Sequence, residues 1–249
     1  MPRRARLNVP GVPLHIVQRG NNRQPTFFSD DDRRFYLECL KDAAERHRCD
    51  VHAYVLMTNH VHLLATPHAP NGISRLMQCL GRRYVQYVNY IHHRSGTLWE
   101  GRFKASLVDS EAYLLTCYRY IELNPVRAKI VAAPSEYRWS SYGCHALGVA
   151  DALVRDHPLF EALGRTTEER CNAYRALFRE RLELPELERI RSSLNHEVVL
   201  GREGFNDQVE KIIGRGVRIP MRGRPRKLIA RERRIHSYRR SHRHLALQK

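Results

Sequence analysis

Two β-rich segments, at residues 51–57 and 60–66, constrain the fold of this chain more than any other feature of its sequence. Both are largely apolar, and only Thr58 and Asn59 lie between them. A connection of two residues is too short for a crossover, so the two strands must be neighbours that run antiparallel. The sequence therefore predicts a β-hairpin to which the other elements are added.

Strand and helix patterns alternate on either side of this hairpin. Residues 14–19 and 103–108 are further strand-like runs, while Ser29 opens a helix as its N-cap and residues 73–92 repeat apolar side chains at helical spacing. The resulting order, β-α-β-β-α-β, is that of the ferredoxin-like arrangement. We therefore expect an α+β fold, in which an antiparallel sheet carries helices on one face.

Beyond residue 150 the sequence changes character twice. Helical patterns alone continue to about residue 214, and Thr166 and Glu169 form a capping box for one of them. From Arg215 onward, glycine and proline interrupt every pattern, and thirteen Lys or Arg residues accompany one acid, Glu232. The predicted parts are a mixed α+β domain at residues 1–149, a helical extension at residues 150–214, and a basic tail at residues 215–249 that is disordered when free.

The overall charge indicates the class of partner. The chain has 43 Lys and Arg against 26 Asp and Glu, a formal net charge of +17. Such an excess favours nucleic acid or an acidic membrane face. No apolar run approaches the roughly 20 residues of a membrane span, and no secretory signal is evident. The six cysteines form no C-x-x-C pair, which is typical of free thiols in a reducing cytoplasm.

His60 and His62 are the sharpest local signal of chemistry. Residues i and i+2 of a strand point to the same face, so both imidazoles leave the sheet together. Two adjacent imidazoles can chelate a metal ion, although an isolated H-x-H pair is more often two ordinary histidines. The chain has no second H-x-[ST] element of the two-histidine phosphodiesterases, and Leu64 stands where a histidine-triad hydrolase has its third histidine.

A third helix supports the metal hypothesis. It is capped by Asp109 and Ser110, and it must end near Asn124 because Pro125 follows. Tyr120 and Asn124 are four residues apart and therefore project from one face of this helix. By itself a Tyr-x-x-x-Asn spacing is common, and Asn before Pro often only ends a helix.

Several motifs between residues 5 and 145 occur in an order that resembles one known family. They are Gly11-Val12-Pro13, Arg19-Gly20-Asn21-Asn22-Arg23-Gln24, Met57-Thr58-Asn59-His60-Val61-His62-Leu63-Leu64, Leu98-Trp99-Glu100-Gly101-Arg102-Phe103 and Tyr120-Ile121-Glu122-Leu123-Asn124-Pro125-Val126-Arg127-Ala128. Together they resemble the REP-associated tyrosine transposases of bacteria, within the single-tyrosine HUH superfamily. The resemblance implies that residues 1–149 are a catalytic domain.

The resemblance also implies a set of site residues. His60 and His62 would bind a divalent metal, Asn124 would complete that metal site, and Tyr120 would be the nucleophile. The implied activity is metal-dependent cleavage and rejoining of single-stranded or hairpin, REP-like DNA through a 5′-phosphotyrosine. Mg²⁺ is the abundant candidate metal, whereas imidazole ligands favour Mn²⁺. Such an enzyme would act in the bacterial cytoplasm, associated with the nucleoid.

Basic side chains provide the candidate DNA contacts. They are Arg82 and Arg83 of the second helix, Arg102 before the fourth strand, and Arg222, Arg224, Arg226 and Lys227 of the tail. Arg222-Gly223-Arg224-Pro225 resembles the core of an AT-hook, which lies in a narrow minor groove; the alternative is a generic basic tail.

Two other functions remain open on the sequence. The chain could be a non-catalytic DNA-binding regulator that retains the fold without the chemistry. It could also bind RNA hairpins, because hairpin recognition and basic tails serve RNA equally well.

Overall fold

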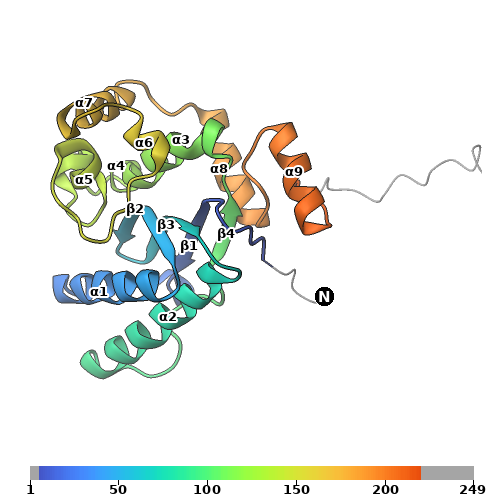
Figure 1. The fold of residues 1–249 in the computed structure, drawn as a ribbon. Coiled ribbons are helices and arrows are strands. Elements are labelled where there is room, and N and C mark those ends of the chain that lie inside the picture. Colours follow the sequence, from blue (N-terminus) through green and yellow to red (C-terminus); the bar gives the residue numbers. More distant parts are fainter. Residues whose placement is uncertain (1–5, 220–249) are drawn as a thin grey trace, which may run out of the picture. The chain divides into compact units, whose positions relative to one another are not determined.

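A four-stranded antiparallel sheet lies at the centre of the structure, a computed structural model that describes residues 6–219 (Figure 1). The strands are β1 (Leu14–Arg19), β2 (Cys49–Met57), β3 (His60–Pro67) and β4 (Lys104–Leu107), and their order in the sheet is β2-β3-β1-β4. Met57 pairs with His60, so the predicted hairpin forms with Thr58 and Asn59 as its turn. This order, with every pair antiparallel, confirms the ferredoxin-like prediction.

Helices cover both faces of the sheet, so the prediction that they lie on one face is wrong. On one face α1 (Asp30–Arg46) and α2 (Gly72–Ile91) pack over Val61 and Leu63; on the other α3 (Ser110–Glu122) packs over Leu64 (Figure 1). The physical reason is visible in β2 and β3, whose apolar side chains alternate toward both faces. A sheet that is apolar on both sides must be covered on both sides.

The short helices and most of the helical extension continue the layer that contains α3, whereas Val209 of the last helix is buried in the core shared with α1 and α2. The bounds of the short helices and of the extension helices are α4 (Asn124–Arg127), α5 (Tyr142–Leu147), α6 (Pro158–Glu161), α7 (Thr167–Leu177), α8 (Leu184–His196) and α9 (Glu203–Ile213). The predicted caps of α1 and α7 are present: the Ser29 and Thr166 side chains accept from the backbone N–H three residues on. Asp109 occupies the N-cap of α3, but its carboxylate accepts hydrogen bonds from Arg202 instead.

The extension joins the sheet directly. The Leu200 N–H donates to the carbonyl oxygen of Leu107 at the end of β4, at 2.8 Å. Val217 is buried, and the Arg218 guanidinium pairs with carboxylates of α9. The described residues therefore cluster as one compact unit that ends at Ile219. The domain boundaries after residues 149 and 214 stay predictions.

A buried carboxylate ties α3 to this extension. The Glu122 side chain, fully buried, accepts hydrogen bonds from Ser141 Oγ at 2.6 Å, His145 Nδ1 at 2.7 Å and Tyr174 Oη at 2.6 Å. These donors come from the start of α5, from α5 itself and from α7. Among residues 6–219, no helix is long and apolar enough to cross a bilayer.

Candidate active site

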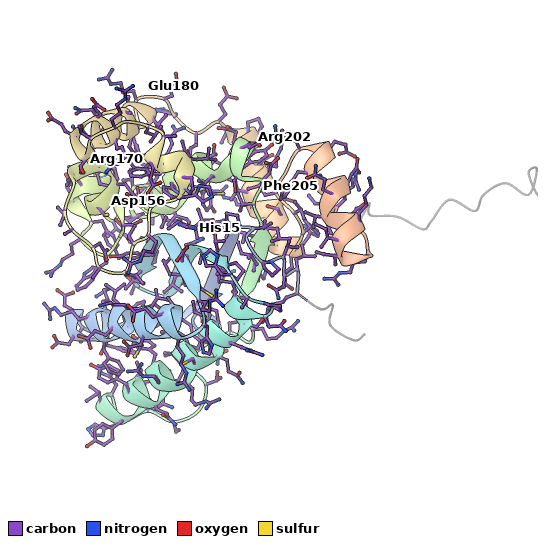
Figure 2. All side chains as sticks on the ribbon, viewed as in Figure 1. His15, Asp156, Arg170, Glu180, Arg202 and Phe205 are labelled. Atoms are coloured by element: carbon purple, nitrogen blue, oxygen red, sulfur yellow. The ribbon has the colours of Figure 1, made fainter. Side chains whose placement is uncertain are left out.

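The face of the sheet that meets α3 carries three histidines. Alternation along β3 places His60 and His62 on this face, and alternation along β1 adds His15. His15 is fully buried and His62 is 5% exposed, whereas His60 is only partly buried. In Figure 2, His15 lies between the strands and the helical layer that contains α3. The pairing predicted for His60 and His62 is therefore present, and His15 is an addition that the sequence did not point to.

The hydrogen bonds of His60 fix its tautomer. Asn59 donates its Nδ2 to the carbonyl oxygen of Arg23 at 2.9 Å, so its Oδ1 faces His60 Nδ1 at 2.7 Å. An amide oxygen can only accept, and Nδ1 of His60 must therefore carry the proton. The lone pair of His60 Nε2 is left to bind a cation.

His62 has the same free nitrogen. Its Nδ1 lies 2.9 Å from His15 Nε2, which leaves Nε2 as the unoccupied position. Burial lowers the pKa of His15 to about 3 and that of His60 to about 4, and burial also holds the pKa of His62 well below its usual value. All three rings are therefore neutral at pH 7, which is the state in which imidazole binds metal.

Tyr120 of α3 lies against these histidines. Its ring centroid is 5.5 Å from that of His15 and 5.9 Å from that of His62, edge-on in both cases, and the side chain is 6% exposed. The Arg127 guanidinium lies 4.2 Å from the Tyr120 ring centroid and donates to the Tyr120 carbonyl oxygen. Burial lowers the pKa of Arg127 to about 10, so it stays cationic at pH 7. A phenol is thus held between neutral imidazoles and a fixed positive charge.

Asn124 completes the set predicted from the sequence. Its Nδ2 donates to the carbonyl oxygens of Tyr120 at 3.2 Å and Ile121 at 3.3 Å, at the end of α3. The amide oxygen is the atom left for a ligand. Asn124 is held there by its own helix end, which explains why the residue stands four positions after Tyr120.

A pocket of about 520 Å³ contains all four predicted residues. It is lined by Val17, Arg19, His60, His62, Glu100, Arg102, Lys104, Tyr120, Asn124, Arg191, Leu194 and Asn195. Two imidazole nitrogens and an amide oxygen fit a divalent cation such as Mn²⁺ or Mg²⁺. Within residues 6–219 no group of three or more His, Cys, Asp or Glu side chains could hold a metal, so a metal here depends on the Asn124 amide.

The predicted DNA-contacting residues fall into three groups. Arg102 lies in the wall of this pocket. Arg82 is exposed on α2, and Arg83 pairs with Asp42 of α1 at 2.7 Å; both belong to the opposite face of the sheet. Arg222, Arg224, Arg226 and Lys227 lie outside the described residues.

Several residues in or beside the pocket were not predicted from the sequence. Alternation along the first strand could have placed His15 on the face of the two predicted histidines. Arg127 belongs to the same sequence motif as Asn124 and could have been selected with it. Arg191 and Asn195 of α8 are about 70 residues from Tyr120 along the chain, and no local pattern connects them.

Comparison with known proteins identifies the part of the chain that carries this site. Residues 8–124 match the family model described as "Transposase IS200 like". The matched range contains His60, His62, Tyr120 and Asn124. This part of the chain is therefore similar to the IS200-like transposases.

One solved structure shares the fold of this chain. The chain resembles the structure of a REP-associated tyrosine transposase bound to a REP hairpin, with 15% identity and a TM-score of 0.51 over 63% of this chain and 93% of that one. At this identity the likeness shows the shared fold. The resemblance indicated by the sequence motifs is thus confirmed in fold, and the family match to residues 8–124 supports it.

A second structure, of a candidate transposase from Deinococcus radiodurans, matches with 19% identity and a TM-score of 0.34 over 48% of this chain and 96% of that one, and no argument rests on it. None of the curated proteins compared with the chain matches it.

Proposed function

We propose that this protein is a transposase, a metal-dependent DNA transesterase that cleaves and rejoins single-stranded or hairpin DNA through Tyr120. One observation carries the proposal: the Tyr120 ring lies 5.9 Å from His62, in the same pocket as His60 and Asn124. A tyrosine nucleophile and a possible cation site therefore face one space. The REP hairpin bound by the structurally similar transposase makes hairpin DNA the first substrate to test.

In the proposed step, the Tyr120 hydroxyl oxygen attacks the phosphorus of one phosphodiester. The bond from phosphorus to the 3′-oxygen breaks, the leaving oxygen takes up a proton to become a 3′-hydroxyl, and the phenol proton passes to solvent. The 5′ end remains on Tyr120 as a phosphotyrosine. Attack by a 3′-hydroxyl on this ester restores a phosphodiester and frees Tyr120, so rejoining needs no ATP.

The protein side chains have distinct parts in this scheme. Arg127 keeps a positive charge at the Tyr120 ring, where it favours development of phenolate character. His60, His62 and Asn124 would hold the cation. A bound Mg²⁺ or Mn²⁺ would polarise a non-bridging phosphate oxygen and offset the charge of the transferring group.

The test is covalent capture of the DNA. A panel of labelled hairpin oligonucleotides with single-stranded flanks is incubated with the protein and Mn²⁺, and denaturing electrophoresis separates any protein–DNA adduct. Tyr120→Phe is expected to abolish the adduct and to leave binding intact, because only a hydroxyl is lost.

Tyr113→Phe is the matched control. Tyr113 lies two turns earlier on α3, where its hydroxyl accepts from Arg189 and does not line the pocket. An adduct that survives Tyr120→Phe but disappears in Tyr113→Phe would contradict the assignment of the nucleophile. Binding without any adduct in the unmodified protein would instead favour the non-catalytic regulator.

A further inference from the structure

Helix α8 forms one wall of the catalytic pocket, although it lies outside the range of the family match. Arg191, Leu194 and Asn195 line the pocket together with Tyr120 and Asn124. The family match ends at residue 124. The extension of this chain therefore contributes to the site itself, and the pocket is incomplete without it.

Packing holds α8 in this position. Leu187, Ile190 and Leu194 are buried in the same core as Tyr120, and Lys104 Nζ of β4 donates to Asn195 Oδ1 at 3.2 Å. Arg191 and Asn195 are four residues apart, so they project from one side of the helix. The buried side of α8 thus fixes which side chains face the pocket.

The charges at the pocket rim are unbalanced. Arg19, Arg102, Lys104 and Arg191 are all exposed there, and Glu100 is the one acid among the lining residues. Within residues 6–219, no carboxylate forms an ion pair with any of these four side chains. By contrast, Arg202 and Arg218 of the same extension are each paired with acidic side chains.

Arg191 also lies close enough to a second cation to interact with it. Its charge contributes to lowering the pKa of Arg127, after the larger effect of burial. Arg127 in turn lies against Tyr120 and has one terminal nitrogen, Nη1, that is buried without a hydrogen-bond partner among the described residues. An anion beside Arg191 would offset this repulsion.

We propose that α8 is part of the substrate-binding surface, and that Arg191 contacts a backbone phosphate of single-stranded DNA as the strand enters the pocket. This inference rests on the proposed function and assigns it a subsite. A single strand is favoured because a volume of about 520 Å³ is that of a pocket for a small ligand, which suits one nucleotide and not a duplex.

Binding measurements with paired probes test this subsite. One probe is a fluorescent DNA hairpin with a flank of about six unpaired thymidines, and the other is the same hairpin without a flank. The full chain carrying Tyr120→Phe is used so that cleavage does not interfere. Adding Arg191→Ala is expected to weaken binding of the flanked hairpin about tenfold, or about 1.4 kcal/mol, because one charge-assisted hydrogen bond to a phosphate is lost.

The salt dependence gives a second readout. Loss of one phosphate contact should reduce the slope of log affinity against log salt by about 0.7 for the flanked probe. Binding of the unflanked hairpin should not change. Arg181→Ala is the matched control, because Arg181 is an exposed arginine of the same extension that does not line the pocket.

The outcomes separate this inference from the proposed function. If the Arg191→Ala variant binds each probe as tightly as the Arg181→Ala variant does, the subsite is overturned. This holds even if the unmodified protein forms the Tyr120 adduct. A loss that is the same with and without the flank would also overturn it, because the contact would then be with the duplex. A missing adduct together with the flank-specific loss would overturn the chemistry and keep the subsite. Tighter binding of an RNA version of the flanked probe would overturn the assignment to DNA.

Discussion

Neighbouring side chains determine which nitrogen of each metal-binding candidate is available. For His62 to present Nε2 to a cation, its Nδ1 must carry the proton, and His15 Nε2 at 2.9 Å is placed to accept that hydrogen bond. His15 Nδ1 is buried without a partner among the described residues. His15 is therefore a positioning residue, and its effect should be measurable on metal binding alone.

We expect His15→Ala to weaken Mn²⁺ binding about 10–100-fold in the absence of DNA, as is typical when the partner of a metal-bound histidine is removed. His15→Gln should recover part of this loss, because an amide oxygen can accept from His62. Titration followed by electron paramagnetic resonance measures free Mn²⁺ directly, and His62→Ala gives the scale for loss of a ligand.

His47→Gln serves as the control, since His47 lies at the opposite end of the β2–β3 hairpin, just before β2 begins. If His15→Ala bound Mn²⁺ as tightly as the unmodified protein, His15 would be a packing residue and the tautomer argument for His62 would fail.

The sequence predicted the site residues that are related to one another by short spacings along the chain. The i, i+2 rule placed His60 and His62 on one face, and the i, i+4 rule placed Tyr120 with Asn124; the pocket contains all four. Arg191 was not predictable because its position depends on how the extension folds back over β4. Arg83 was misleading for a related reason: the pattern showed an exposed arginine but not its partner, Asp42.

Among the secondary-structure elements, α3 carries both the proposed nucleophile, Tyr120, and a buried carboxylate, Glu122, on different sides of the helix. The Glu122 carboxylate has no exposure, and its three donors come from Ser141, His145 and Tyr174. The position of the nucleophile is therefore linked to the helical extension by one buried group. Replacing that group should destabilise the described unit as a whole.

We expect Glu122→Ala to lower the free energy of unfolding by about 3–5 kcal/mol, because it leaves three buried donors without their acceptor. Tyr174→Phe, which removes one of those donors, should cost about 1–3 kcal/mol. Urea denaturation followed by circular dichroism measures both. A smaller loss for Glu122→Ala than for Tyr174→Phe would show that the carboxylate does not organise these helices.

The elements themselves were largely predictable. Capping residues and apolar spacing located α1, α2, α3, α7, α8 and α9. The hairpin fixed the register of β2 with β3 from the turn as far as Ala53, where the register shifts. The sequence pattern did not reveal α5 and α6, because helices of four to six residues have too few turns to show a period. The second covered face of the sheet was missed because the β-α-β-β-α-β order accounts for only one layer of helices.

For the molecule as a whole, the distribution of charge matters more than its total. Residues 220–249 contain eleven Lys or Arg and one acid, and they lie outside the described unit. Residues 215–219 belong to that unit, where Val217 is buried and Arg218 pairs with three acidic side chains of α9. A truncation that tests the tail must therefore end at Ile219, since a cut after Gly214 would also remove part of the fold.

We expect truncation after Ile219 to reduce the slope of log affinity for hairpin DNA against log salt by about 4. This assumes that half of the eleven cations contact phosphate and that each contact contributes roughly 0.7 to the slope. Affinity at moderate salt should fall by orders of magnitude, and fluorescence anisotropy across a salt series measures both quantities. Cleavage of saturating hairpin should persist, because Tyr120, the three candidate ligands and Arg191 all lie before the cut. A truncated protein with an unchanged salt slope and no cleavage would contradict the assignment of DNA attraction to the tail and of cleavage to the described unit. The tail would then be completing the active site instead of attracting DNA to it.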